Sequence, residues 1–405
     1  MPYINNPVPG AYQFFPLNQP AIGDRLEPKA SDPKLFQPLT LRNVTFKNRI
    51  LVPPMCMYSA KDGHVTDWHL VHLGGLASRG VGGICVEATA VVPEGRISPE
   101  DAGIWADSHI APFRKVVDFS HAQGTKIGIQ LAHAGRKASC HAPWVQDRAP
   151  KGTSYVAQKE ENGWPDNVRG PSELAYHPKY PTPKGLSIKE IDDVVQAFID
   201  GAHRSEAAGF DFIEIHAAHG YLIHEFLSPI SNGRSDEYGG SFENRIRLLL
   251  RIATAARAAW PNKPLFVRIS ATEWVEGPEK EGNEWKQWGL EQSALLAQKL
   301  YEIGVDLLDV STGGNSSHQK IPAGPGFQVP FAAEIRKRVP GLAVGAVGLI
   351  TEAQQAENYL KEGKADVIFL GRELLRNPDW PLEAAKKLGV KLKAANQYER
   401  AWYKL

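Results

Sequence analysis

Residues 212–221 contain side chains whose types and spacing suit acid–base chemistry. The segment begins with the alternation of a β-strand, and His216 and His219 would point to opposite faces if that strand continued. If the chain turns after the strand, the three-residue spacing puts both imidazoles on one side. Gly220 permits a tight bend before Tyr221. Two imidazoles could then polarise an oxygen atom while the phenol delivers a proton, at the carboxyl end of a strand where α/β proteins build their sites.

Two other interpretations of these histidines remain open. A histidine on an apolar strand is commonly a structural residue with satisfied hydrogen bonds. A metal site with His216, His219 and His224 as ligands is the second alternative. No ligand spacing such as H-E-x-x-H accompanies these residues, and we therefore expect no metal.

Composition excludes several classes of function. The chain has 405 residues, and 46 Lys and Arg nearly balance 45 Asp and Glu, so no basic field predicts binding to nucleic acid or to an anionic membrane. The three cysteines, Cys56, Cys85 and Cys140, are too few for a disulfide framework or an iron–sulfur cluster and suit a reducing compartment. The sequence contains neither a secretory signal nor an apolar run of about 18 residues. We therefore expect a cytoplasmic protein.

Apolar segments typical of strands alternate with amphipathic segments typical of helices. The strand segments are residues 49–53, 83–87, 126–131, 211–216, 265–270, 306–310, 343–347 and 366–370. The helical segments lie near residues 68–79, 109–123, 187–208, 242–259, 290–303, 329–338, 352–362 and 379–387. Eight strand–helix alternations predict an α/β fold with a single (β/α)₈ TIM barrel. A doubly wound sheet is the alternative, but neither G-x-G-x-x-G nor a phosphate loop follows any strand.

The predicted organisation is one barrel with added segments. Residues 1–34 form a proline-rich N-terminal arm, residues 35–388 the barrel and residues 389–405 a C-terminal arm. A small hairpin over residues 39–46 precedes the first strand. The long insertion at residues 138–186 follows the third strand and is expected to cover the barrel mouth, and residues 271–289 form a second insertion after the fifth strand.

Strand alternation also predicts which polar side chains point into the barrel. With the aliphatic residues facing the helices, Glu87, Gln130, Glu214, His216 and Arg268 face inward. An unpaired buried charge costs several kcal/mol, so these groups must be paired or hydrogen-bonded. Because they lie on neighbouring strands, Glu214 and Arg268 could be partners. We interpret this interior as a ligand-binding site rather than a polar plug without chemistry.

Two glycine-containing loops predict a phosphate site. Residues 345–348 follow the seventh strand, and residues 371–376, which begin with Gly371 and Arg372, follow the eighth. Glycines let backbone N–H groups approach a phosphate, and arginine adds a fork of donors. The loops after strands seven and eight are the usual phosphate site of such barrels.

Several motifs together resemble one family. They are residues 54–58, 86–88, 128–136, 214–229, 236–241, 266–268 and 371–376. In this order the chain resembles the old yellow enzyme family of FMN-dependent ene-reductases, in particular its thermophilic-like branch. The resemblance covers roughly residues 35 to 400 and implies a barrel of this class.

The resemblance implies a role for each matching residue. Residues that would hold the flavin ring are Pro53, Pro54, Met55, Cys56, Ala88, Gln130 and Arg268, and those that would bind the FMN phosphate are Gly348, Gly371 and Arg372. Cys56 would also tune the flavin potential, and Tyr58 would line the substrate pocket. His216 and His219 would hydrogen-bond the substrate oxygen, and Tyr221 would donate the proton.

The implied reaction has two half-reactions. NADPH or NADH would reduce FMN and leave, and an α,β-unsaturated carbonyl compound or a nitroalkene would then take hydride at its β carbon and a proton from Tyr221 at its α carbon. Arg400 matches an arginine that crosses from a neighbouring subunit in this branch, which implies a homodimer or a higher homo-oligomer, although a solvated tail charge is the plain alternative. A flavin-dependent isomerase and a non-catalytic flavin-binding protein are the competing functions. A lyase with Lys126 as Schiff-base lysine is disfavoured, because Lys126 begins its strand.

Overall fold

Eight parallel strands close into a barrel in the computed structural model, which describes Asn18 and residues 20–403. The barrel strands are β3 (Ile50–Val52), β4 (Gly83–Ala90), β5 (Lys126–Ala132), β8 (Phe212–Ala217), β9 (Leu265–Ser270), β12 (Leu307–Ser311), β13 (Ala343–Ala346) and β14 (Val367–Phe369). They follow one another around the barrel in chain order, and β14 pairs with β3 to close it. The predicted (β/α)₈ barrel is therefore confirmed. Of the two predicted arms, residues 1–17, 19, 404 and 405 lie outside the described residues.

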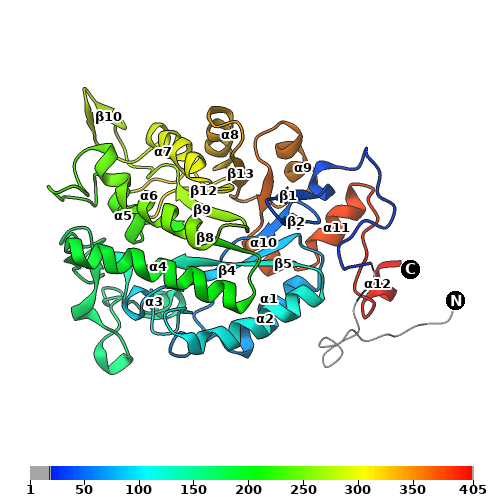
Figure 1. Ribbon diagram of the computed structural model, residues 1–405, viewed down its shortest axis with the longest axis horizontal. Coiled ribbons are helices and arrows are strands. Elements are labelled where there is room, and N and C mark those ends of the chain that lie inside the picture. The colour runs from blue at the N-terminus through cyan, green and yellow to red at the C-terminus, as the bar shows by residue number, and fades with distance from the viewer. Residues whose placement is uncertain (1–17, 19, 404–405) are drawn as a thin grey trace.

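A helix follows each barrel strand, and the helices surround the barrel (Figure 1). These helices are α1 (Asp67–Ala77), α2 (Ile110–Ala122), α4 (Ile188–Ala208), α6 (Phe242–Ala259), α7 (Leu290–Ile303), α8 (Val329–Arg338), α9 (Ala353–Lys361) and α11 (Trp380–Lys387). The shorter helices are α3 (Pro143–Arg148), α5 (Leu222–Leu227), α10 (Arg372–Arg376) and α12 (Glu399–Tyr403). Three predicted helices, α6, α7 and α8, have the expected bounds.

Local signals explain why α4 begins and ends where it does. Ser187 Oγ accepts a hydrogen bond from the Glu190 backbone N–H, and the Glu190 carboxylate accepts one from the Ser187 N–H at 2.8 Å. This reciprocal cap satisfies two donors that a helix start leaves free. Gly209, with φ of 94°, ends the helix in a left-handed conformation that suits glycine.

The amino end of the barrel is plugged by apolar side chains. The inward-facing plug residues are Leu51, Cys85, Phe212, Phe266, Leu307, Val367 and Phe369. The hairpin of β1 (Leu39–Leu41) and β2 (Val44–Phe46) adds Phe46, whose ring lies 5.8 Å from that of Phe212. Aliphatic residues of the opposite strand face pack against the helices. The barrel is therefore filled below, and polar residues remain only toward its carboxyl end.

Two predictions about inward-facing charges are wrong. A β-bulge in β4 shifts the pairing between Val86 and Ala88, so Ala88 rather than Glu87 lies opposite Gln130. Glu87 instead meets His69 of α1, with 3.4 Å between Oε2 and Nε2. One extra residue in a strand reverses the side-chain alternation beyond it, which explains the error.

The predicted Glu214–Arg268 pair is also wrong. Arg268 Nε lies 3.0 Å from Asp309 Oδ2, and the two residues are register partners on β9 and β12. Glu214 instead accepts a hydrogen bond from Gln130 Nε2 at 2.8 Å. Arg268 thus has its counter-charge on the strand that follows β9, not on the one before it.

The insertion at residues 138–186 contains α3 and two short paired strands, β6 (Arg169–Gly170) and β7 (Lys184–Gly185). Trp144 of α3 packs edge-on against Tyr58, with ring centroids 5.4 Å apart, and Trp164 lies beneath the Arg96 guanidinium at 4.4 Å. The second insertion forms the hairpin of β10 (Lys280–Glu281) and β11 (Glu284–Trp285). Both insertions follow barrel strands on the carboxyl side.

The described ends of the chain lie together. Arg25 and Leu392 form an antiparallel bridge, and Arg79 of the barrel covers the Tyr398 ring at 4.1 Å. Figure 1 shows α12 on the side of the molecule away from α5, which directly follows Tyr221. In the part of the chain that the structure describes, no helix has the length and apolar character needed to cross a membrane.

We expect Phe46→Ala to lower the apparent free energy of unfolding by about 3–5 kcal/mol, because it opens a cavity in the plug. Urea denaturation of the purified protein measures this change. Thr45→Ala is the matched control, because Thr45 is exposed on the same strand and should change stability by no more than about 0.5 kcal/mol. Equal effects of the two substitutions would show that the hairpin does not close the barrel.

Candidate active site

His216, His219 and Tyr221 come together at the carboxyl end of β8. The His216 ring centroid lies 5.2 Å from that of His219 and 5.0 Å from that of Tyr221. The chain leaves the strand after Ala217 and turns, with a hydrogen bond from Tyr221 N–H to the Ala218 carbonyl. The predicted turn and cluster are therefore present.

The turn adopts an unusual backbone conformation. His219 has φ of 60° and Gly220 has φ of 70°. Positive φ costs free energy for a residue with a side chain, so surrounding contacts must hold His219 in place. The His219 N–H donates to Ser270 Oγ at 2.9 Å, and the Ser270 hydroxyl donates to the Gly313 carbonyl at 2.8 Å. The loop after β12 thus supports the turn after β8.

Lys137 joins these two loops directly. Its Nζ donates to the His219 carbonyl at 2.9 Å and to the Gly314 carbonyl. The ammonium also lies 4.0 Å from the Tyr176 ring centroid and 5.6 Å from that of Tyr221. Burial, reinforced by the neighbouring Arg136 charge, lowers the pKa of Lys137 to about 7.

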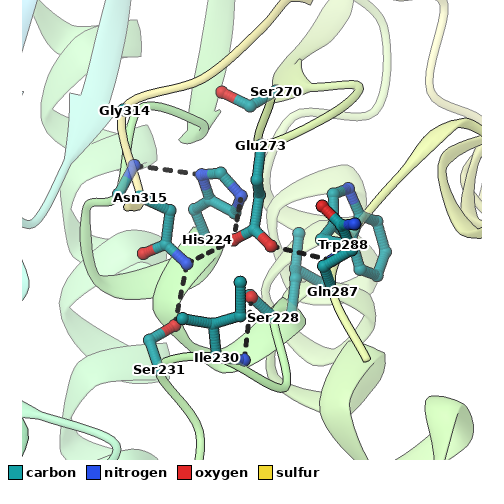
Figure 2. Close-up of polar contacts among 12 residues, drawn as sticks. His224, Ser228, Ile230, Ser231, Ser270, Glu273, Gln287, Trp288, Gly314 and Asn315 are labelled. Atoms are coloured by element: carbon teal, nitrogen blue, oxygen red, sulfur yellow. Dashed lines mark hydrogen bonds and ion pairs between the residues drawn. The ribbon is translucent and has the colours of Figure 1, made fainter. Parts of the chain in front are cut away.

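A buried polar network lies behind the turn (Figure 2). The Gly220 N–H donates to His224 Nδ1 at 3.0 Å, and His224 Nε2 points toward Glu273 Oε1 at 3.8 Å. The Glu273 carboxylate accepts hydrogen bonds from the Trp288 N–H and from Asn315 Nδ2. The network therefore fixes the Gly220 peptide, which lies between His219 and Tyr221 in the chain.

The ring nitrogens of the two histidines have different surroundings. His219 Nε2 lies 2.8 Å from Ser311 Oγ. His216 Nδ1 is buried without a hydrogen-bond partner among the described residues. A buried polar atom without a partner is rare and marks a position where a ligand atom would satisfy it.

Burial determines the protonation of the cluster. It lowers the pKa of His216 and of His219 well below 6.5, and the Arg268 charge acts in the same direction. Burial also raises the pKa of Tyr221 well above 10. Both imidazoles are therefore neutral, and the phenol keeps its proton at neutral pH.

A cavity of about 280 Å³ opens at the carboxyl ends of β3, β9, β13 and β14. Seven predicted cofactor residues line it, namely Pro53, Pro54, Met55, Arg268, Gly348, Gly371 and Arg372. Gly348 has φ of 130°, a conformation that favours glycine. Three arginines, Arg268 of β9 and the two ends of α10, and two glycines suit a ligand with an anionic group and a polar ring edge. These residues fit FMN.

The three other predicted cofactor residues do not line this cavity. Gln130 donates to Glu214, and Ala88 lines a small cavity that also contacts Asp101 and Tyr221. Burial raises the pKa of the Cys56 thiol well above 9, although the Ala88 backbone N–H and the Tyr58 hydroxyl favour the thiolate. Cys56 is therefore a protonated thiol beside Tyr58.

Arg400 lies exposed on α12, on the side of the molecule away from α5 (Figure 1). The structure does not bring it to the His216–Tyr221 turn of its own chain. Among residues 18 and 20–403, no group of three His, Cys, Asp or Glu residues is arranged to hold a metal ion.

Several site residues escaped the sequence analysis. Asp309 alternates with Leu308 and Val310 in its strand, so the alternation rule could have identified it as inward-facing. Lys137 directly follows a motif that we recognised, but its contacts depend on a loop 177 residues away. Glu273 had no local signal, since its partners His224, Trp288 and Asn315 lie far from it along the chain.

Comparison with known sequences connects this site to a family. The profile of the NADH:flavin oxidoreductase / NADH oxidase family matches residues 34–390. An NADPH dehydrogenase of Geobacillus thermodenitrificans is 48% identical over 370 residues, or 91% of this chain and 98% of the relative. An NADPH dehydrogenase of Bacillus subtilis is 45% identical over 371 residues, or 91% and 99%. An NADH:flavin oxidoreductase of Gibberella zeae is 47% identical over 396 residues, or 96% and 94%.

Solved structures share the fold. Morphinone reductase in complex with tetrahydroNAD matches with a TM-score of 0.68 at 26% identity, over 89% of this chain and 92% of that protein. A complex of 2-naphthoyl-CoA reductase with 2-naphthoyl-CoA matches with a TM-score of 0.76 at 23% identity. That match covers 87% of this chain and 52% of the reductase, and it shows the fold alone.

The neutral imidazoles predict a dependence of stability on pH. An unfolded histidine binds a proton below about pH 6.5, whereas buried His216 does not, so acid favours the unfolded chain. Between about pH 7 and pH 5.5 the free energy of unfolding of the wild type should fall by about 1 kcal/mol more than that of His216→Asn. Urea denaturation across this range measures the difference. His318→Asn, at an exposed position, is the control, and parallel curves for His216→Asn and wild type would contradict a buried neutral imidazole.

Proposed function

Because the chain belongs to the NADH:flavin oxidoreductase / NADH oxidase family, the old yellow enzyme family, we propose that it is an ene-reductase. The protein is a flavin-dependent NAD(P)H oxidoreductase that uses FMN. In the proposed reaction it reduces carbon–carbon double bonds conjugated to a carbonyl or nitro group. The observation that carries this proposal is the convergence of His216, His219 and Tyr221 on one side of the turn after β8.

The two histidines bind the substrate oxygen in this proposal. His216 Nδ1 is buried and unpartnered, so a ligand oxygen would satisfy it. The Ser311 hydroxyl donates to Gln328 Oε1 at 3.3 Å, so Ser311 Oγ accepts from His219 Nε2–H. This contact fixes the His219 ring beside His216. A neutral N–H donor of His216 in this buried site stabilises negative charge that develops on the oxygen.

Tyr221 supplies the proton. Its pKa is raised by burial, so the phenol is protonated at working pH and can donate to the α carbon. The His216 ring and the Lys137 ammonium restrict the position of the phenol from two sides. Bound FMN supplies the hydride chemistry, first with NAD(P)H and then with the β carbon of the alkene.

The remaining residues hold the cofactor or shape the pocket. In this proposal the residues that hold the flavin ring are Pro53, Pro54, Met55, Cys56, Ala88, Gln130 and Arg268. Those that bind the FMN phosphate are Gly348, Gly371 and Arg372. Two observations support this division: seven of these ten residues line one cavity, and three arginines line the same cavity. Tyr58 lines the substrate side, and Trp144 of the insertion packs on it. Residues 138–186 therefore act as the cover of the mouth.

We also propose that the protein is a homodimer or higher homo-oligomer whose C-terminal arm, residues 389–405, carries Arg400 into the site of a neighbouring subunit. Arg400 is exposed and lies away from the turn of its own chain. An arginine beside the mouth would bind the anionic groups of a nicotinamide cofactor or an electron-rich substrate oxygen.

Tyr221→Phe tests the proton donor. It should slow alkene reduction by about 100-fold or more, the usual contribution of a general acid, and leave FMN reduction by NADPH nearly unchanged. Anaerobic stopped-flow absorbance of the bound flavin follows each half-reaction separately. Tyr180→Phe removes a half-buried phenol in the insertion and is the matched control. Equal loss in both half-reactions would contradict the role, and isomerised product under excess NADPH would favour the isomerase.

Co-expression of two inactive variants tests the crossing arm. Arg400→Ala keeps an intact Tyr221, and Tyr221→Phe keeps an intact Arg400. A mixed oligomer then contains sites in which both residues are present, so activity should return if the arm crosses between subunits. Light scattering gives the oligomeric state, and Lys391→Ala, another exposed charge on the arm, is the control. A fully active Arg400→Ala monomer would end the proposal.

A further inference from the structure

The floor of the cofactor cavity contains an ion pair with an unusual environment. Arg268 lines the cavity, and its Nε lies 3.0 Å from Asp309 Oδ2. Asp309 is fully buried, and Arg268 is 7% exposed. The guanidinium therefore lies between the cavity and a carboxylate that solvent does not reach.

Asp309 depends on that single cation. Neither of its carboxylate oxygens accepts a hydrogen bond among the described residues, because the contact with Arg268 is an ion pair without hydrogen-bond alignment. On the adjacent strand β13 its register partner is Gly345, which has no side chain to donate. Below it lie the apolar plug residues Phe266 and Leu307.

The other titratable groups that face this pair add no positive charge. Glu214 of β8 and Cys85 of β4 are both buried beside Asp309 and Arg268, and His216 and His219 are neutral. Two carboxyl groups thus share one guanidinium. An unpaired buried charge is costly, so the cluster is most stable when only one of the two carboxyl groups is ionised.

The surroundings decide which one holds the charge. Glu214 accepts a hydrogen bond from Gln130 but has no cation of its own, and burial together with the Asp309 charge raises its pKa. Asp309 has the Arg268 guanidinium at 3.0 Å, and this charge opposes the rise in pKa that burial causes. Near pH 7, Glu214 is therefore protonated and Asp309 is ionised.

We propose that Asp309 takes up a proton when the bound FMN is reduced. The negative charge of the reduced flavin interacts with the Arg268 guanidinium and so weakens the interaction that keeps Asp309 ionised. This inference rests on the proposed position of the flavin ring beside Arg268. The hydride of NAD(P)H brings two electrons and one proton to the flavin, which becomes an anion. The second proton comes from water and converts the Asp309 carboxylate to the acid, and it leaves again when the flavin is reoxidised.

The midpoint potential of the holoenzyme reports this coupling. For a two-electron couple, each proton taken up contributes about 30 mV per pH unit. The midpoint potential of the wild type should change by about 60 mV per pH unit between about pH 6 and pH 8. Asp309→Asn also removes the charge that keeps Glu214 protonated, so it is combined with Glu214→Gln. The double variant cannot take up the second proton, and its midpoint potential should change by about 30 mV per pH unit throughout.

Glu214→Gln is the matched control. It replaces a neutral acid by a neutral amide of the same shape. The midpoint potential should therefore keep the wild-type dependence of about 60 mV per pH unit. A wild-type slope of about 30 mV per pH unit, a wild-type slope in the Asp309→Asn/Glu214→Gln double variant, or a slope lost in Glu214→Gln would each overturn the assignment to Asp309.

Two further measurements keep the inference independent of variant folding and of the proposed function. A pH indicator in weak buffer counts the protons that the wild-type holoenzyme takes up during electrochemical reduction at pH 7. A count of two supports the proposal, and a count of one contradicts it. Arg268→Lys distinguishes a failure of the proposed flavin position from a failure of the proposed role of Asp309. If it leaves the potential and FMN affinity unchanged, the proposed flavin position fails. If it shifts them while the Asp309→Asn/Glu214→Gln double variant keeps the wild-type slope, only the role of Asp309 fails.

Discussion

The interior of this barrel is arranged around one buried guanidinium, whose positive charge requires a counter-charge. Arg268 can remain charged at the floor of the cofactor cavity because Asp309 lies 3.0 Å away on the adjacent strand. The plug of aromatic and aliphatic side chains beneath it excludes water, so the charge of Arg268 acts strongly on every group nearby. The protonation of Glu214 and the neutrality of both histidines follow from this arrangement and from burial.

The same burial produces the chemistry of the turn after β8. Neutral imidazoles can donate hydrogen bonds, and a phenol that keeps its proton can serve as an acid. The strained conformation of His219 is maintained by Ser270, by Lys137 and by the network behind Gly220. These contacts come from the end of β9, from α5 and from the segment after β5, and rigidity at the turn is thus a property of several elements together.

Two parts of the carboxyl end of the barrel differ in how they are built. The cavity beside Arg268 is lined by short loops with glycines directly after β13 and β14. The insertion at residues 138–186 contributes aromatic side chains, and its Trp144 and Tyr176 pack on Tyr58 and Lys137. In the proposed function the first part would hold the cofactor and the second would cover the substrate.

The sequence by itself determined the barrel, the helices to within two residues at each end and the identity of the His216–Tyr221 cluster, because these depend on periodicity and on residues close in the chain. Only the tertiary structure decided that Glu87 turns toward α1, since a bulge of one residue leaves no trace in composition. Only the register of β9 and β12 decided that Arg268 pairs with Asp309 rather than with Glu214. Contacts between residues tens of positions apart depend on how strands align in space, and that alignment is a property of the folded chain as a whole.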